Sequence, residues 1–220
     1  NVGDANSNYL FDPGESWQFS LEQTIAVGHH SNSFYCAALD PVIDMVLSPG
    51  ASAAYFGVLP SIIVAQSFTD GGTVLPEGSA ALENTNIEVE YTLTNEGNTG
   101  LTDVSVAGAT RVSGDTNEDN VLDLDETWVF SGTTTALAGN QTVATAVTAR
   151  DPLTDTTVGD SASGTYFGAV VDWSMATLWN GEQGNPPDLI VGESFHVVYY
   201  LENMGNVDLA DIELQGAVPV

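Results

Sequence analysis

The sequence has 220 residues, of which 30 are Asp or Glu and two are Lys or Arg, so its formal net charge is −28 at pH 7. A surface this acidic repels nucleic acid and anionic membranes and attracts cations, so we expect no nucleic-acid partner and an environment rich in salt or divalent metal. Hydrophobic residues make up 43% of the chain, which is typical of a globular protein. No apolar run reaches the roughly 20 residues of a membrane span, and no signal peptide is present, as in a mature segment of a secreted protein.

Strand patterns dominate the chain. Residues 87–94 alternate apolar and polar side chains, which predicts a strand with one buried face. In chain order, we predict strands at 87–94, 101–107, 127–135, 141–149, 161–168 and 195–202. Short strands at this spacing favour an all-β fold, an antiparallel β-sandwich that is immunoglobulin-like in the broad sense.

Residues 115–126 match the twelve-position calcium loop, in which oxygen ligands stand at positions 1, 3, 5, 9 and 12 and a backbone carbonyl at position 7. These positions are Asp115, Asn117, Asp119, Asp123 and Glu126, with the carbonyl of Val121. An earlier segment keeps the whole pattern with Asp4, Asn6, Asn8, Asp12 and Glu15, and the carbonyl of Leu10. Calcium takes six to eight oxygen ligands at about 2.3–2.6 Å, so we expect Ca²⁺ in both loops.

Two features depart from the usual calcium loop. Position 6, normally Gly, is Asn120 in one loop and Tyr9 in the other, and the flanking segments are predicted strands instead of helices. The alternative is a solvated acidic turn, which the recurrence of the ligand set makes the weaker interpretation. Because Asp119 replaces Asn8, we expect the second loop to bind calcium more tightly.

The chain also repeats itself. The Tyr-Phe-Gly motif at 55–57 recurs at 166–168, an offset of 111 residues (166 − 55). The same offset superposes 4–17 on 115–128, and an offset of 108 residues (199 − 91) superposes 91–98 on 199–206. At the first offset the single cysteine, Cys36, matches Val147 on a predicted strand, so we expect it to pack in a core.

The repeats divide the chain into three parts. Residues 58–167 form a complete repeat, 1–57 the C-terminal half of another, and 168–220 the N-terminal half of a third. Half a sandwich leaves strand edges and an apolar face open. If the domains run in line, we expect 168–220 of one unit to be completed by 1–57 of the next, head to tail, which generates a filament. Two versions fit: a covalently continuous chain, or separate subunits joined by strand complementation.

Other motifs are few. Asp40, Pro41 and Asp44 recur as residues 151, 152 and 155, which favours a hairpin turn over a second metal site. No nucleophile elbow, zinc motif or phosphate loop occurs, so we expect no enzyme.

The stretch 91–106, followed by Gly114-Asp115, Asp123 and Glu126-Thr127-Trp128, resembles the immunoglobulin-like repeat of giant bacterial and archaeal cell-surface proteins. The resemblance covers 58–167 and both terminal halves. It implies extracellular, non-catalytic β-domains in tandem that serve as stalks, adhesins or surface fibres. The glycine that the family places before the loop glutamate is Asp125 here, although Gly14 keeps it in the other copy.

The leading hypothesis is therefore a structural segment of a cell-surface filament, stabilised by calcium and pairing with itself. The alternative is an adhesin that binds a glycan or another cell surface, with Trp173 and Trp179 as the candidate aromatic residues.

Overall fold

The structure is a computed structural model, and it describes all residues except 1–2, 41, 71–72, 180–187 and 216–220. The described residues form β-strands and no helix, which confirms the predicted all-β class. None of them therefore belongs to a helix that could cross a membrane. The chain divides into two compact units, Asn1–Leu59 and Pro60–Val220.

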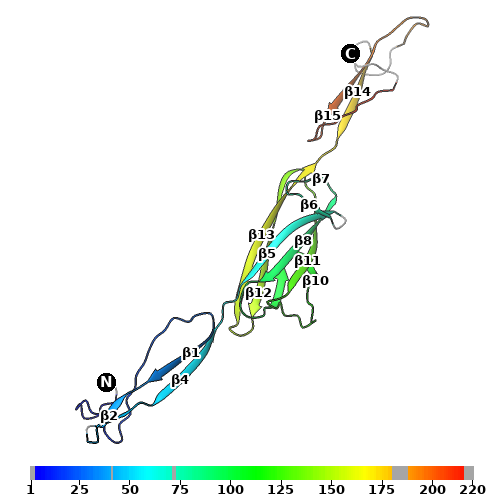
Figure 1. Ribbon diagram of the computed structural model, residues 1–220. Helices are drawn as coiled ribbons and strands as arrows, with labels where there is room; N and C mark the ends of the chain where they lie inside the picture. Colours follow the sequence, from blue (N-terminus) through cyan, green and yellow to red (C-terminus); the bar gives the residue numbers. More distant parts are fainter. Residues whose placement is uncertain (1–2, 41, 71–72, 180–187, 216–220) are drawn as a thin grey trace. The chain divides into compact units, whose positions relative to one another are not determined.

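In the larger unit, two sheets, whose strands Figure 1 shows, enclose a shared core. The five-stranded antiparallel sheet has the order β10-β11-β8-β5-β6, formed by Ala109–Ser113, Thr127–Thr135, Asn86–Asn95, Ile62–Asp70 and Thr73–Leu75. The four-stranded sheet has the order β7-β13-β12-β9, formed by Ala80–Leu82, Thr156–Ala169, Gly139–Asp151 and Thr102–Val106. Its one parallel pair is β7 with β13. The arrangement is β-sandwich-like.

The core follows from the alternation read in the sequence. Along β8 every second side chain is buried: Ile87, Val89, Tyr91 and Leu93. The four-stranded sheet contributes Val147, Ala149 and Tyr166 to the same cluster. Each predicted strand from 87 to 168 corresponds to an observed strand, and the prediction at 127–135 matches β11 in both bounds.

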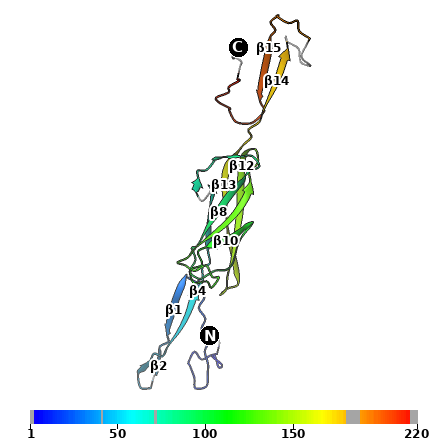
Figure 2. The same cartoon turned by 90° about the vertical axis from the view of Figure 1, so that its right-hand side faces the viewer.

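After the sandwich, β14 (Trp173–Trp179) and β15 (Val197–Asn203) form an antiparallel hairpin, seen from two sides in Figures 1 and 2. Met175 pairs with Leu201 as Val64 pairs with Leu93, so the hairpin repeats the register of β5 with β8. In contrast to their buried counterparts on β8, Tyr199 and Leu201 are exposed.

The smaller unit contains β1 (Gly28–Tyr35), β2 (Ala38–Asp40), β3 (Met45–Leu47) and β4 (Gly50–Gly57). Strands β1 and β4 pair with Gly28 opposite Gly57, which is the Gly139–Gly168 register of β12 and β13 shifted by 111 residues (139 − 28). Residues 16–24, the counterpart of β11, are all described and form no strand.

Cys36 is exposed, so the prediction that it packs in a core is wrong for this chain. Its counterpart, Val147, is buried and lies opposite Val106 of β9. The smaller unit has no strand corresponding to β9 among its described residues, which leaves the cysteine uncovered.

Candidate metal site

The loop 114–126 connects β10 with β11 and takes a tight course that its sequence permits. Gly114 has a positive φ of 110°, and a Cβ there would lie 2.1 Å from the carbonyl oxygen of Thr127. Asn120, at position 6 of the calcium pattern, has φ 61°, and Tyr9 in the earlier loop has φ 63°. Both residues therefore adopt the left-handed conformation that usually requires glycine at this position.

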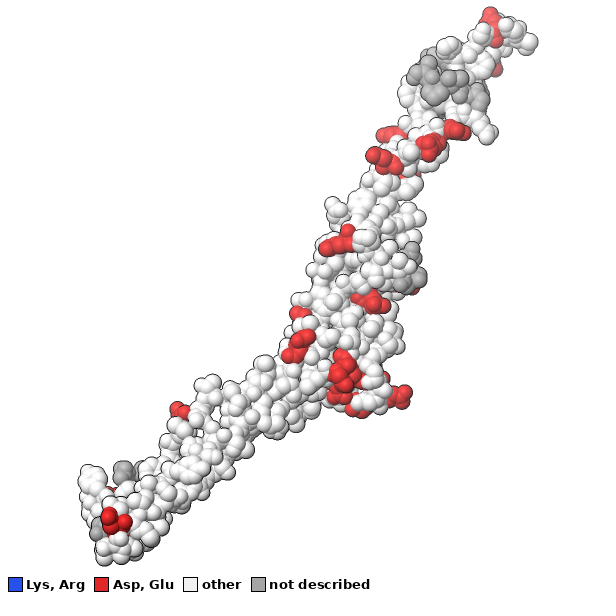
Figure 3. All heavy atoms as spheres, in the orientation of Figure 1, with Lys and Arg blue, Asp and Glu red and all other residues white. Residues whose placement is uncertain are grey.

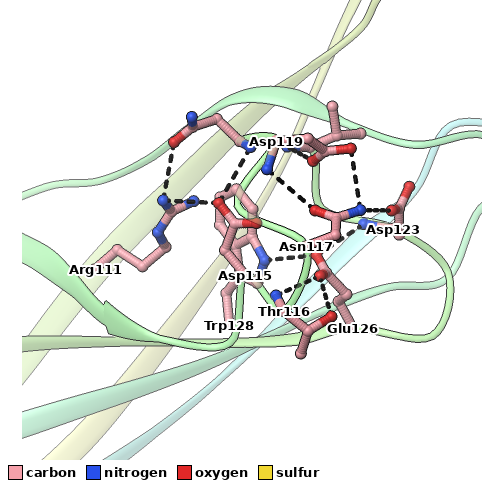
Figure 4. A network of polar contacts seen from close by, with 10 residues as sticks. Arg111, Asp115, Thr116, Asn117, Asp119, Asp123, Glu126 and Trp128 are labelled. Carbon is pink, nitrogen blue, oxygen red and sulfur yellow. Dashed lines mark hydrogen bonds and ion pairs between the residues drawn. The ribbon is translucent and has the colours of Figure 1, made fainter.

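Short-range hydrogen bonds coil the loop (Figure 4). Asp119 N–H donates to Asn117 Oδ1 at 3.1 Å, and Val121 N–H donates to Asp119 Oδ1 at 2.8 Å. Asn117 Nδ2 donates to a carboxylate oxygen of Asp119 and to one of Asp123, each at 3.1 Å. The side chains at positions 3, 5 and 9 therefore converge, with an amide N–H₂ group between two carboxylates.

Asp115 has an unusual environment. Its side chain is only 7% exposed, and Oδ2 forms an ion pair with Arg111 at 2.9 Å and accepts from Asn120 N–H at 3.1 Å. Its other oxygen, Oδ1, is buried and has no hydrogen-bond partner among the described residues. A buried carboxylate oxygen without a donor is costly. A bound cation would satisfy it, so this atom fits an oxygen-liganded metal.

Glu126 closes the loop. One carboxylate oxygen accepts from Thr116 N–H and Oγ1–H, both at 2.7 Å, and the other accepts from Trp128 Nε1–H at 2.9 Å and Asp123 N–H at 3.4 Å. The hydrogen bond from the Thr116 side chain, helped by the others, lowers the pKa of Glu126 from 4.5 to about 2. Glu126 is therefore ionised at neutral pH and ties both ends of the loop to the buried Trp128.

Residues 4–15 repeat this network. Asn6 Nδ2 donates to Asp12 at 2.8 Å, as Asn117 does to Asp123. The remaining equivalent bonds are Ala5 N–H, Asp12 N–H and Trp17 Nε1–H to Glu15, Tyr9 N–H to Asp4, Asn8 N–H to Asn6, and Leu10 N–H to Asn8. The two loops differ at all six non-ligand positions, so the ligand positions account for the shared geometry.

The structure does not bring all predicted ligands into one cluster. Among the described residues, no group of three or more His, Cys, Asp or Glu side chains is placed to hold a metal ion. In the second loop, the Asn117 amide separates two of the carboxylates, and Glu126 is engaged by four donors. The loop is closed by its own hydrogen bonds.

Sequence reasoning overlooked Arg111. Its guanidinium lies 4.1 Å from the ring centroid of Trp128 and bridges Asp115 and Asn120. The rarity of basic residues was the available signal, since Arg111 and Arg150 are the only two. Arg150 also pairs with carboxylates, those of Asp155 and Asp103.

The Asp-Pro turn at residues 151–155 is a hairpin turn, as predicted, whereas Pro41 of the other copy lies outside the described residues. The turn at 151–155 joins β12 to β13, and the fully buried Asp151 accepts from Thr99 Oγ1–H at 2.8 Å and Thr154 N–H at 2.8 Å. Burial raises the pKa of Asp151, but these hydrogen bonds outweigh it and the net pKa is lowered. Both carboxylate oxygens of Asp151 accept hydrogen bonds, which stabilise the turn.

Figure 3 shows several separate groups of Asp and Glu side chains on the visible face of the described residues, and no group of basic side chains is visible there. One dense acidic group lies where Figure 1 draws the loop between β10 and β11. Local negative potential of this kind attracts cations.

Comparisons of the chain with protein-family models, with curated proteins and with solved structures find no match.

Proposed function

We propose that this chain is a structural segment of an extracellular or cell-surface filament or stalk, built head to tail from immunoglobulin-like repeats that calcium stabilises. The role is non-catalytic. The observation that carries the proposal is that the same structure recurs at an offset of 111 residues. The register of β12 with β13 recurs in β1 with β4, and the hydrogen-bonded acidic loop 115–126 recurs in residues 4–15. A chain that repeats strands, register and loop in series is typical of a stalk or fibre.

Calcium fits the loops on chemical grounds. In the second loop, the side-chain oxygens of Asp115, Asn117, Asp119 and Asp123 and the carbonyl of Val121 would hold it, with Glu126 at the closing position. The unpartnered, buried Asp115 Oδ1 supports this assignment. When bound, the ion supplies positive charge that offsets the repulsion among the loop carboxylates. Asn117 would turn its amide oxygen toward the ion, because its N–H₂ group now stands between two carboxylates.

Calorimetry of chelator-stripped protein tests the calcium assignment. We expect heat on titration with Ca²⁺, a higher melting temperature, and loss of one of two binding events in Asp115→Asn. The matched control is Asp125→Asn, which removes the same charge from an exposed, non-ligand position of the same loop. Absence of heat and of a thermal shift in the unsubstituted chain would contradict calcium binding.

The head-to-tail arrangement leaves two chemical versions, a continuous chain of repeats or separate subunits. A denaturing gel of the natural material distinguishes them, because separate subunits of this length run near 23 kDa and a continuous chain runs as very large material. Electron microscopy tests the assembly class itself, for which we expect fibres with an axial repeat of one or two domains that soften on chelation.

An adhesin that binds a glycan is the second candidate, and the exposure of Trp173 is the observation in its favour. However, the counterpart of Trp173 in the complete repeat is Ile62, a buried core residue. Trp179 stacks on Phe195 with ring centroids 5.7 Å apart. Glycan-array binding that disappears in Trp179→Ala would support the adhesin.

A further inference from the structure

We propose that two copies of this chain join by completing one sandwich, with residues 16–24 of the first copy pairing antiparallel to β15 of the second. In this pairing Trp17 lies opposite Leu201. On the other sheet, residues 210–214 of the second copy pair with the β1–β2 segment of the first, which places Cys36 opposite Leu214. This inference rests on the proposed function and specifies its partner as a second copy of the chain.

The complete repeat supplies the template for both pairings. Within it, β11 pairs with β8 so that Trp128 faces Leu93, and β12 pairs with β9 so that Val147 faces Val106. Subtracting 111 from the first member of each pair and adding 108 to the second gives Trp17 with Leu201 and Cys36 with Leu214. Because the hairpins β1–β4 and β14–β15 already keep the template's registers, these are the pairings that remain to be formed.

Side-chain exposure marks the two faces as halves of one core. Phe19 is 76% exposed, whereas its counterpart Phe130 is 5% exposed. Leu201 is 39% exposed, whereas Leu93 is fully buried. Large apolar side chains that gather on one exposed surface mark a site of interaction with a partner. In the complete repeat, the side chains that correspond to one face cover those that correspond to the other.

Each half also contains an open apolar hollow. In the smaller unit, a cavity of about 720 Å³ is lined by Phe19, Leu21, Ile25, Phe34 and Tyr55, among others. Beside β15, a cavity of about 480 Å³ is lined by apolar residues that include Leu201, Leu209 and Ile212, and also by Glu202, Asp211 and Glu213. Counterparts of these residues, such as Phe130, Leu93 and Leu101, belong to the single core of the complete repeat.

A polar group supports the same partner. In the complete repeat, the buried Asn95 Nδ2 donates to the carbonyl oxygens of Thr99 at 2.7 Å and Leu122 at 2.9 Å. Its counterpart, Asn203, repeats the first bond by donating to Val207 O at 2.8 Å. The counterpart of Leu122 is Phe11, so the second bond would go to the Phe11 carbonyl of the other copy.

The residue at the predicted junction makes a direct test possible, since Cys36 is the one cysteine of the chain. Residues directly opposite on antiparallel strands have Cβ atoms about 4.5–5.5 Å apart, close to the separation that a disulfide spans. In Leu214→Cys we expect mild oxidation to give a ladder of dimers and higher species on a non-reducing denaturing gel. The matched control, Glu213→Cys, places the thiol on the opposite face of the strand and is expected to give none.

The unsubstituted chain provides a second readout that does not depend on a variant folding. Cys36 is exposed in the single chain and would be covered in the joined pair, as Val147 is. We therefore expect its rate of maleimide labelling to fall at least tenfold as the protein concentration rises. Labelling at a constant rate together with no ladder would overturn the proposal. A disulfide confined to one chain, which runs as an oxidised monomer, would also overturn it.

Calcium calorimetry on the same samples separates this inference from the proposed function. Loss of the ladder with calcium heat intact refutes only the pairing between copies. A ladder without calcium heat refutes only the calcium assignment.

Discussion

Leu93 and Leu201 form a matched pair that tests whether the complete repeat folds by itself while the half-repeat does not. Both are leucines at the same position of the repeat, but Leu93 is 0% exposed and Leu201 is 39% exposed. Removing three carbons from a fully buried leucine loses about 2.4 kcal/mol of transfer free energy, at about 0.8 kcal/mol for each carbon. The cavity that remains adds roughly 1–2 kcal/mol.

We therefore expect Leu93→Ala to lower the free energy of unfolding by about 4 kcal/mol. For Leu201→Ala, only the buried three-fifths of the side chain contributes transfer free energy. Because the site is open to solvent, no cavity contribution is added. The expected cost is about 1.4 kcal/mol, and it falls on the β14–β15 hairpin instead of the sandwich. In dilute protein, the main unfolding transition of Leu201→Ala therefore coincides with that of the unsubstituted chain.

Urea unfolding followed by circular dichroism measures both costs. Equal shifts of the midpoint in the two variants at low concentration would refute the claim that Leu201 lacks its cover in the single chain. Repeating the measurement at high protein concentration adds a second arm. There, pairing between copies is expected to raise the cost of Leu201→Ala toward that of Leu93→Ala.

Three further predictions concern the second acidic loop. The pKa of Glu126 is lowered from 4.5 to about 2, so its carboxylate stabilises the fold fully above pH 4.5, and this stabilisation is lost as the pH falls toward 2. The melting temperatures of the unsubstituted chain and of Glu126→Gln are therefore expected to converge between pH 4.5 and 2. Gly114→Ala is expected to lower the free energy of unfolding, measured in urea, by more than about 3 kcal/mol, because the new Cβ would lie 2.1 Å from the Thr127 carbonyl oxygen of β11. The control is Gly108→Ala, whose Cβ would have no atom within 4 Å, so only the strain of its positive φ destabilises that variant. Arg111→Gln is expected to strengthen calcium binding in calorimetry, because it frees Asp115 Oδ2, and to lower the melting temperature without calcium.

The sequence was sufficient to predict most of the strands that carry the core, although β5, which contributes Ile62 and Phe68, was not predicted. Alternation along 87–94 places Val89, Tyr91 and Leu93 on one face, and the structure buries that face in the sandwich. The acidic loops were predictable for a similar reason, since the hydrogen bonds that coil them join residues at most ten positions apart. Local pattern is a sufficient guide where local contacts decide the structure.

The sequence was insufficient where a feature depends on a distant partner. Residues 16–24 alternate Trp17, Phe19 and Leu21 with polar residues, as a strand does, yet they form no strand. A single strand has no ladder of hydrogen bonds to hold it, so alternation alone cannot make one. The orientation of the Asn117 amide was also beyond prediction, because it depends on the charges that Asp119 and Asp123 present once the loop has folded.

Calcium binding and the joining of copies are expected to be coupled, because the first acidic loop leads directly into residues 16–24, which pair with β15 of the second copy in the proposed junction. Glu15 accepts from Trp17 Nε1–H at 3.1 Å, so the loop carboxylate sets the position of the first apolar residue of 16–24. A cation in this loop would hold that end of the strand in place and offset the repulsion between two acidic copies. We therefore expect chelation to lower the disulfide yield of Leu214→Cys severalfold, and excess calcium to restore it. Sodium chloride of equal ionic strength is the control, since it screens charge without filling the loop. Restoration by salt alone would show that screening, and not a bound ion, controls the junction.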